Sequence, residues 1–380
     1  MNLRSIRKIP VLYRLLSFAR RTGGRAWMRA MRRAKGIQKN TVLFTSFKGK
    51  SYSDSPRYIS EALHALRPET DIAWQIANEA DVPDYVRPVK PHSLAALTGL
   101  ATARCFVDNF NRPIYLEKYD GQLYVQTWHG DRGFKKIMYD MGDAIAYPDG
   151  GQIDLAISGS EFGTRLYRTA FRYHGDVMQL GMPRNDMLVK GDDALAKKVR
   201  KRVGVGTKKV MLYAPTFRDS TAGKAQQAGF DIAAALDALG GGWVCITRAH
   251  DLNRGIASAA DDRIYDVTSY PEMAELLLIA DLLVTDYSSS AGDFALTGRP
   301  MILYQPDLDE FIGSDRNMYF DIRKSPYLRA ESEGELMQLL SRVNELPRVG
   351  KDVLAFYGAT ETGESAQAVA QWIARKLDEK

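Results

Sequence analysis

The stretch LLVTDYSSSAGDFALTG, from Leu282 to Gly298, decides the fold class because it holds the parts of an α/β unit in order. Leu282 to Thr285 is a short apolar run, typical of a buried strand, and three serines follow at 288–290. Serine hydroxyls cap helix N-termini, so the next segment is predicted to be a helix that Gly298 ends. The stretch thus predicts a strand that leads through a polar loop into a helix.

The same alternation of short apolar runs with helical stretches recurs from residue 41 onward, which is the pattern of parallel α/β sheets. We expect strands at 41–45, 72–76, 104–108, 123–127, 155–158, 210–215, 243–247, 282–285 and 301–305, and another that ends at 266–268. Ser55 is the predicted cap of a helix over 57–66, and Pro271 is predicted to open a helix that runs to Ile279.

A chain of 380 residues is too long for one ordinary core, and a charged stretch at 190–209 separates its two halves. We therefore predict an α/β protein with two Rossmann-type domains that face each other across a cleft. The predicted parts are a basic N-terminal segment (1–40), a first domain (41–195), a second domain (205–355) and a C-terminal helix (356–380) able to pack back on the first domain.

The first forty residues carry twelve Lys or Arg and no Asp or Glu, which leaves the rest of the chain with 40 basic against 46 acidic residues. Apolar residues spaced by three and four predict one or two basic amphipathic helices, interrupted near Gly23 and Gly24. Such a segment suits an anionic membrane surface, the interpretation we favour over a helix packed on the body with a solvated basic face. Nucleic acid is not favoured, because the remaining chain is acidic and shows no nucleic-acid-binding motif.

Composition places the protein among globular proteins of a reducing compartment. Hydrophobic residues make up 45% and charged residues 26%, no apolar run reaches membrane-spanning length, and no signal peptide is evident. Cys105 and Cys245 lie far apart within apolar runs and are predicted to be buried thiols. The expected location is the cytoplasmic face of the membrane, with peripheral attachment, and homo-oligomers are not excluded.

Four polar loops follow predicted strands: 127–130 (TWHG), 216–219 (TFRD), 248–251 (RAHD) and 285–289 (TDYSS). The carboxyl ends of parallel strands are where α/β proteins build their sites. Backbone N–H groups and hydroxyls at the start of a helix bind phosphate, and Arg218 and Arg248 would neutralise a second phosphate. A lone histidine in a loop is more often structural than catalytic, so position is what makes these loops candidates.

Seven short motifs occur in an order that resembles the CDP-glycerol glycerophosphotransferase family of teichoic acid primases and polymerases. They span roughly residues 41–330 and read SFKGKSYSDSPRYI, QTWHG followed by KK, GMPRND, APTFRD, TRAH, DVTSYPEMAELLLIADLLVTDYSSSAGDFA and YQPDLDEF. The resemblance implies a GT-B-like fold and transfer of a polyol phosphate from a CDP-linked donor to a hydroxyl of a polyprenyl-linked saccharide or growing chain, with release of CMP.

By the same resemblance, His129 matches the general base toward the acceptor and His250 matches the histidine beside the donor pyrophosphate, although the two roles are interchangeable at this point. The implied donor-binding residues are Arg218, Arg248, Ser288 and Ser289 for the pyrophosphate, Tyr270, Pro271 and Glu275 for the cytidine, and Asp286, which together with Asp293 has an equal claim to a capping or orienting role. No cofactor or dedicated metal site is expected, and any Mg²⁺ would be held by phosphates and scattered carboxylates.

The chain departs from the family where many members read TPLKK, since here Asp131 and Arg132 precede Gly-Phe-Lys-Lys. This leaves the acceptor in question rather than the reaction class. Trp128 is expected to pack. Arg184 and Asp186 are interpreted as an ion pair at a turn in preference to donor ligands. For Lys135 and Lys136, contact with acceptor phosphates and exposure to solvent are given equal weight. The absence of a long domain before residue 41 favours a primase-like enzyme. The alternatives are a nucleotide-sugar glycosyltransferase and a non-catalytic membrane-bound scaffold.

Overall fold

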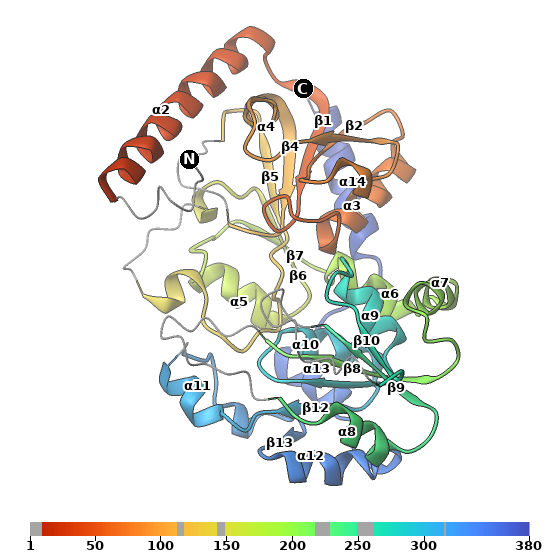
Figure 1. Cartoon of the computed structure of the whole chain (residues 1–380). Helices are drawn as coiled ribbons and strands as arrows, with labels where there is room; N and C mark the ends of the chain where they lie inside the picture. Colours follow the sequence, from red (N-terminus) through yellow and green to blue (C-terminus); the bar gives the residue numbers. More distant parts are fainter. Residues whose placement is uncertain are drawn as a thin grey trace.

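Two parallel sheets, one above the other in Figure 1, form the body of the protein. The computed structural model describes residues 10–111, 118–142, 149–216, 229–248, 261–314 and 317–379. The first sheet has the order β3-β2-β1-β4-β5-β6-β7 and the second the order β10-β9-β8-β11-β12-β13. All strand pairs in both sheets are parallel. The predicted class of two Rossmann-type domains is confirmed.

The strands of the first sheet are β1 (Gln38–Thr45), β2 (Asp71–Gln75), β3 (Val86–Val89), β4 (Ala103–Asp108), β5 (Leu123–Gln126), β6 (Leu155–Ser158) and β7 (Asp176–Gln179). Its helices are α2 (Pro10–Lys35), α3 (Asp54–Leu66), α4 (Leu94–Thr102) and α5 (Glu161–Thr169). Side chains alternate across β1, so that Leu43 belongs to the core under α2 and α4, while Val42 and Phe44 belong to the core under α3 and the C-terminal helix α14 (Ser365–Asp378).

The strands of the second sheet are β8 (Lys209–Ala214), β9 (Trp243–Thr247), β10 (Ile264–Asp266), β11 (Leu282–Thr285), β12 (Met301–Tyr304) and β13 (Arg329–Ala330). The accompanying helices are α6 (Asp186–Lys190), α7 (Asp193–Val203), α8 (Ile232–Leu239), α9 (Met273–Ile279), α10 (Ser290–Phe294), α11 (Leu308–Ser314), α12 (Glu333–Leu340) and α13 (Gly350–Tyr357). Buried aliphatic side chains cover both faces of this sheet, as expected for a sheet between two helical layers.

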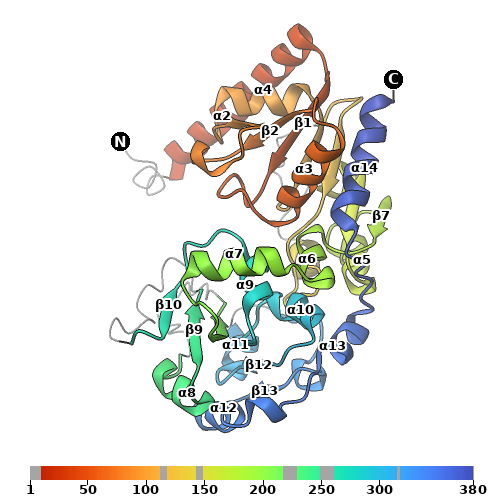
Figure 2. The ribbon, with the colours of Figure 1, turned by 90° about the vertical axis from the view of Figure 1, so that its right-hand side faces the viewer.

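The chain returns to the first domain at its end. Helix α13 packs with the second domain, the chain then crosses at 358–364, and α14 packs on α3 through Val369, Ile373 and Leu377. Figure 2 shows α14 alongside the first domain and α13 below it. The crossing segment is tied down by an isolated bridge between Ser160 and Ala359.

Helix α2 runs without a break through Gly23 and Gly24, so the predicted interruption is wrong. Glycine lowers helix propensity, but packing of one helix face compensates for it. Trp27 donates from Nε1 to Thr98 Oγ1 at 3.0 Å, and Met28 is buried against α4. This part of α2 is thus a helix packed on the body. No helix within the described ranges combines the length and the apolar character needed to cross a membrane.

Several predicted boundaries are corrected. Helix α3 begins at Asp54 with Ser53, not Ser55, as its N-cap residue, and α9 begins at Met273 after the N-cap Glu272 rather than at Pro271. Strand β10 ends at Asp266, two residues earlier than expected. Cys105 and Cys245 are buried free thiols, as predicted.

Candidate active site

A cavity of about 370 Å³ lies between the two domains, at the carboxyl ends of their strands. In the first sheet the strand order reverses between β1 and β4, and in the second between β8 and β11, and such switch points are where open α/β sheets bind ligands. The cavity joins the two switch points. Its lining residues are Phe47, Asp54, His129, Arg184, Ala214, Pro215, Arg248, Thr268, Met273, Ala274, Leu277, Ser288, Ser289, Ser290 and Asp293.

His129 lines the first-domain side of the cavity, in the loop after β5. Its Nδ1 lies 2.6 Å from the backbone carbonyl oxygen of Asn109. A carbonyl only accepts, so Nδ1 carries the proton and Nε2 keeps its lone pair. Desolvation by burial lowers the pKa of His129 against the opposing effect of this hydrogen bond. The ring is therefore a neutral imidazole with an acceptor nitrogen at working pH, as a general base requires.

The residue before His129 holds the loop in a strained shape. Trp128 has a φ of 51°, which a residue with a side chain rarely adopts. Its backbone N–H donates to Gln126 Oε1 at 2.8 Å, and its indole packs edge-on against Phe171 with ring centroids 5.1 Å apart. Trp128 packs, as expected from the sequence, while the His129 ring stacks on Phe110 at 5.2 Å.

The opposite wall carries hydroxyls and a cation from the second domain. Ser288, Ser289 and Ser290 follow β11, and Ser288 Oγ accepts from Ser290 Oγ at 2.9 Å. Arg248 follows β9 and donates from Nη2 to the Pro271 carbonyl oxygen at 3.3 Å. Burial lowers the pKa of Arg248, which the nearby carboxylates of Glu272 and Asp54 oppose. A phosphate group in the cavity would meet a guanidinium and several hydroxyl donors.

Arg184 adds a second guanidinium to the lining, and its expected pairing with Asp186 is wrong. Its Nε and Nη2 donate to Asp293 Oδ2 at 3.1 and 3.0 Å. Asp186 instead accepts from the backbone N–H groups of Ser365 and Ala366, at the start of α14. Sequence proximity suggested a local pair, whereas the fold supplies a partner on α10, 109 residues away in the chain.

The residues predicted at the cytidine position form a contact between domains and are not among the cavity lining. Glu275 Oε1 binds Arg57 Nη1 of α3 at 2.8 Å, and the Tyr270 hydroxyl donates to Glu275 Oε2. Pro271 supplies the carbonyl that Arg248 binds. Asp286 accepts from the backbone N–H of Thr216 at 2.8 Å, an orienting contact within the second domain.

Two predicted residues, Arg218 and His250, lie outside the described residues, so the structure does not place them. It brings together His129, Arg248, Ser288 and Ser289 around one cavity. Sequence reasoning missed Phe47, in the loop after β1, and Asp54, at the start of α3, although an α/β site is expected at this strand end. Lys135 lies with Nζ 4.9 Å from the centre of the Phe311 ring, outside the cavity lining.

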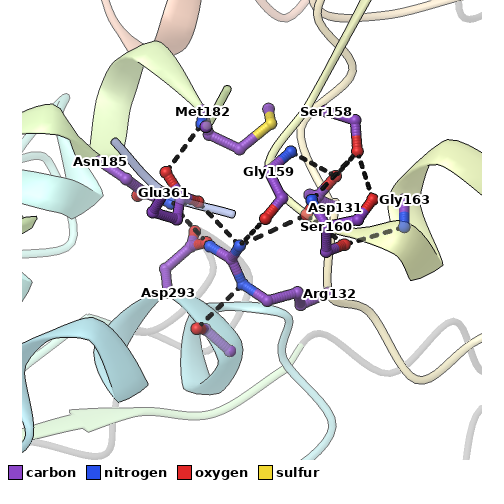
Figure 3. Close-up of polar contacts among 12 residues, drawn as sticks. Asp131, Arg132, Ser158, Gly159, Ser160, Gly163, Met182, Asn185, Asp293 and Glu361 are labelled. Atoms are coloured by element: carbon purple, nitrogen blue, oxygen red, sulfur yellow. Dashed lines mark hydrogen bonds and ion pairs between the residues drawn. The ribbon is translucent and has the colours of Figure 1, made fainter. Parts of the chain in front are cut away.

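A network of buried charges adjoins the cavity through Arg184 and Asp293, and Figure 3 shows the part of it around Arg132. Arg132 is 0% exposed, and Asp293 binds it through Oδ1 while binding Arg184 through Oδ2. Asp131 and Glu361 complete the network around Arg132, at 3.4 and 2.7 Å. Buried charges of this kind are tolerated only when paired, so these residues are mutually dependent. Asp293 thus orients two arginines and also lines the cavity, so its contacts fit both roles that the sequence analysis gave it.

Glu272 joins the domains at the rim and gives a testable pH dependence. Its Oε2 accepts from the Asp54 backbone N–H at 2.6 Å, and burial raises its pKa from 4.5 to about 7.

The folded protein therefore keeps a proton between about pH 4.5 and 7 that the unfolded chain has lost, so the free energy of unfolding falls as pH rises through this window. From pH 5 to pH 8, the free energy of unfolding of wild type is expected to fall by about 2–3 kcal/mol more than that of Glu272→Gln, as measured by urea unfolding. A difference that does not change with pH would contradict this.

Comparison with known proteins gives a family. The model of the CDP-glycerol:poly(glycerophosphate) glycerophosphotransferase family matches residues 27–374. The chain belongs to this family. The resemblance read from the motifs is thereby confirmed over more of the chain than those motifs span.

Curated members of the glycerophosphotransferase family are about 30% identical to the chain. The teichoic acid glycerol-phosphate transferase of Staphylococcus aureus is 31% identical over 368 residues, covering 88% of this chain and 93% of that protein. The teichoic acid poly(glycerol phosphate) polymerase of Staphylococcus epidermidis is 29% identical and covers 90% of this chain. The chain spans about half the length of that polymerase (52%) and 42% of the corresponding Bacillus subtilis polymerase.

Solved structures agree with this membership. A structure of the wall teichoic acid polymerase TagF superposes with a TM-score of 0.84 at 25% identity and covers 100% of this chain and 99% of that one. A UDP-N-acetylglucosamine 2-epimerase from Listeria monocytogenes, at 13% identity and a TM-score of 0.53, shares the fold alone. The GT-B-like fold class is confirmed.

Proposed function

We propose that the protein transfers glycerol phosphate, or a related polyol phosphate, from a CDP-linked donor to a hydroxyl of a polyprenyl-linked saccharide or growing teichoic acid-type chain, with release of CMP. The observation that carries this proposal is the cavity between the domains. It sets His129, whose Nδ1 is engaged by the Asn109 carbonyl so that Nε2 is the nitrogen able to accept a proton, opposite hydroxyls and guanidinium groups. Family membership supports a CDP-linked donor, and so does a solved structure of a TagF variant with CDPG.

The chemistry follows from this division of the cavity. The acceptor oxygen attacks the β-phosphorus of the donor, His129 Nε2 takes the hydroxyl proton, and the bond from phosphorus to the CMP oxygen breaks. Arg248, Arg184 and the serine hydroxyls neutralise charge on the phosphoryl oxygens, which is the main requirement of phosphoryl transfer. His129 is thus proposed as the general base, and His250 is proposed to lie beside the donor pyrophosphate.

The number of units transferred is a finer question. The primase-like reaction expected from the sequence rested on chain length. Relatives matched over nine-tenths of their own length include both the S. aureus glycerol-phosphate transferase and a poly(glycerol phosphate) polymerase of Bacillus spizizenii. Length therefore does not separate the two reactions, and the mass of the product does.

We also propose that the acceptor is met at the membrane surface. The basic segment 1–40 carries twelve Lys or Arg and no acidic residue, and each such residue near an anionic bilayer contributes roughly 1 kcal/mol of attraction. The peripheral, cytoplasmic-face location belongs to the same proposal.

The test is CMP release from CDP-glycerol with a polyprenyl-linked disaccharide presented in vesicles. We expect release only in the presence of acceptor, a product heavier by whole glycerol-phosphate units, and faster turnover on vesicles with anionic lipid than on neutral ones. CDP-ribitol replaces the donor in a parallel arm. Release of UDP from a UDP-sugar would favour the glycosyltransferase alternative, and nucleotide binding without turnover across the panel would favour the scaffold.

A further inference from the structure

We propose that Arg132 is a positioning residue that holds the loop 129–133 of the first domain against α10 of the second domain, and so fixes the general base relative to the donor-binding serines. This rests on the proposed function for the roles of His129 and the serines. The contacts themselves are independent of any assigned reaction.

The Arg132 guanidinium is bound from two domains at once. It donates from Nε to the Gly292 carbonyl oxygen at 3.1 Å and from Nη2 to Asp293 Oδ1 at 2.8 Å, both on α10 of the second domain. Its Nη1 lies 3.2 Å from the Gly159 carbonyl oxygen of the first domain and 2.7 Å from Glu361 Oε1 of the crossing segment. Figure 3 shows the guanidinium among Gly159, Asp293 and Glu361. A fork with fixed donors makes such simultaneous contacts, which a lysine does not.

Asp131 ties the same loop to the first domain. Its Oδ2 accepts from Ser160 Oγ at 2.7 Å, and its Oδ1 accepts from Ser158 Oγ at 2.9 Å and from the Gly159 N–H at 3.1 Å. Gly163 leaves the room for this carboxylate, because a Cβ there would lie 1.8 Å from Asp131 Oδ1. Two successive residues therefore anchor the loop in opposite directions, Asp131 to the start of α5 and Arg132 to α10.

The loop and α10 pack directly on each other. A Cβ built on Gly292 would lie 2.5 Å from Arg132 Cβ, so no larger residue fits there without moving one of the two segments. Cβ positions on Gly130 and Gly133 would lie 3.7 Å from Ser289 Oγ and 3.9 Å from Ser289 Cβ, respectively. A single methyl group added to either glycine would thus touch Ser289, so the backbone that carries His129 passes close to a serine of the donor side.

Arg132 is not among the residues that line the cavity, so it acts on the reaction through its neighbours, which are the loop that carries His129 and Asp293 of the cavity lining. Other contacts between the domains do not involve it, among them Arg57 with Glu275 and the Asp54 N–H with Glu272. Loss of Arg132 should therefore free the loop without separating the domains. Because small displacements of reacting groups reduce rates steeply, turnover should suffer more than donor binding.

The main experiment compares wild type with Arg132→Met, Arg132→Lys and Arg67→Met. The Arg67 control removes an arginine whose ion pairs with Glu69 and Asp378 lie on the outer side of the first domain. We expect kcat to fall by about 10²-fold in Arg132→Met and by less in Arg132→Lys, while the Kd for CDP-glycerol in calorimetry stays within about twofold. Equal kcat in wild type and Arg132→Met, or a loss of donor affinity that matches the loss of rate, would overturn the proposal.

A readout without turnover separates this proposal from the proposed function. Burial lowers the pKa of His129, while the facing carboxylate of Asp54 raises it and the facing Arg184 lowers it. A freed loop admits water, so the NMR titration of His129 should move to higher pH in Arg132→Met and stay unchanged in Arg67→Met. If wild type transfers nothing, this shift still tests the positioning role. An unchanged titration in a folded Arg132→Met protein would contradict it.

Gly292→Ala serves if Arg132→Met does not fold. It keeps every charge and places a methyl group against Arg132 Cβ, which pushes the loop and α10 apart. The same fall in kcat with retained donor binding is expected. Wild-type kcat in folded Gly292→Ala would show that the spacing of these segments does not affect turnover and would contradict the positioning role of Arg132.

Discussion

Replacing His129 with alanine is expected to lower acceptor-dependent CMP release by ~10²- to 10⁴-fold, the usual contribution of a general base. The Nδ1–H bond to the Asn109 carbonyl leaves Nε2 as the acceptor nitrogen in the cavity. Arg248, Ser288 and Ser289 remain in place, so the Kd for CDP-glycerol should change little. The measurement is kcat at saturating donor and acceptor, with donor affinity from calorimetry.

His174→Ala is the matched control, because this histidine is exposed and is not among the cavity lining. Wild-type kcat/KM should fall on the acid side with an apparent pKa below 6.5, since burial lowers the pKa of His129 and keeps the basic form available. A His129→Ala enzyme that keeps more than about a tenth of the wild-type kcat would show that another group takes the proton.

Asp293→Ala is expected to destabilise the fold by about 3–5 kcal/mol, the largest stability effect we predict. Asp293 is buried and gives one carboxylate oxygen to Arg132 and the other to Arg184. Its pKa is lowered, with the two arginines outweighing desolvation. Without this carboxylate, two buried guanidinium groups lose a shared partner and repel each other. Urea unfolding at neutral pH measures the loss.

Asp237→Ala provides the comparison, because its carboxylate pairs with Arg263 at 2.7 Å but is 70% exposed. Exposed ion pairs contribute about 0–1 kcal/mol, so this variant should unfold almost as wild type does. Similar stability losses in the two variants would mean that burial of the Asp293 pair does not determine its contribution.

The central strands were predictable from sequence, whereas the edge strands β3 and β7 of the first sheet were not. Runs such as TVLFT and LLVT are buried on both faces and therefore read as continuous apolar segments. β3 has the sequence VRPV, and β7 has only partly buried positions after Asp176. An edge strand with one exposed side needs no apolar run, so its pattern resembles that of a loop.

Individual site residues were predictable where they follow a central strand. His129 and the serines after β11 stand at strand ends, and the fold brings strand ends together. Arg184 was given the wrong partner because its true one, Asp293, lies 109 residues away in the chain. Glu275, which was predicted to contact the cytidine, pairs with Arg57 across the domain boundary, and nothing in the sequence indicated this contact. Pairings between domains leave no periodic signal in the sequence.

The return of the chain to the first domain has a mechanical consequence. The polypeptide passes between domains twice, near Gly181 and again at 358–364, and the two passages are bonded together: Thr362 N–H donates to the Leu180 carbonyl at 2.9 Å, and Met182 N–H donates to Glu361 Oε2 at 2.9 Å. Two adjacent chain connections that are bonded to each other restrict relative motion of the domains mainly to rotation about the line they define. We therefore expect any opening of the cavity to be a rotation about this line, with little sliding or twisting of the domains.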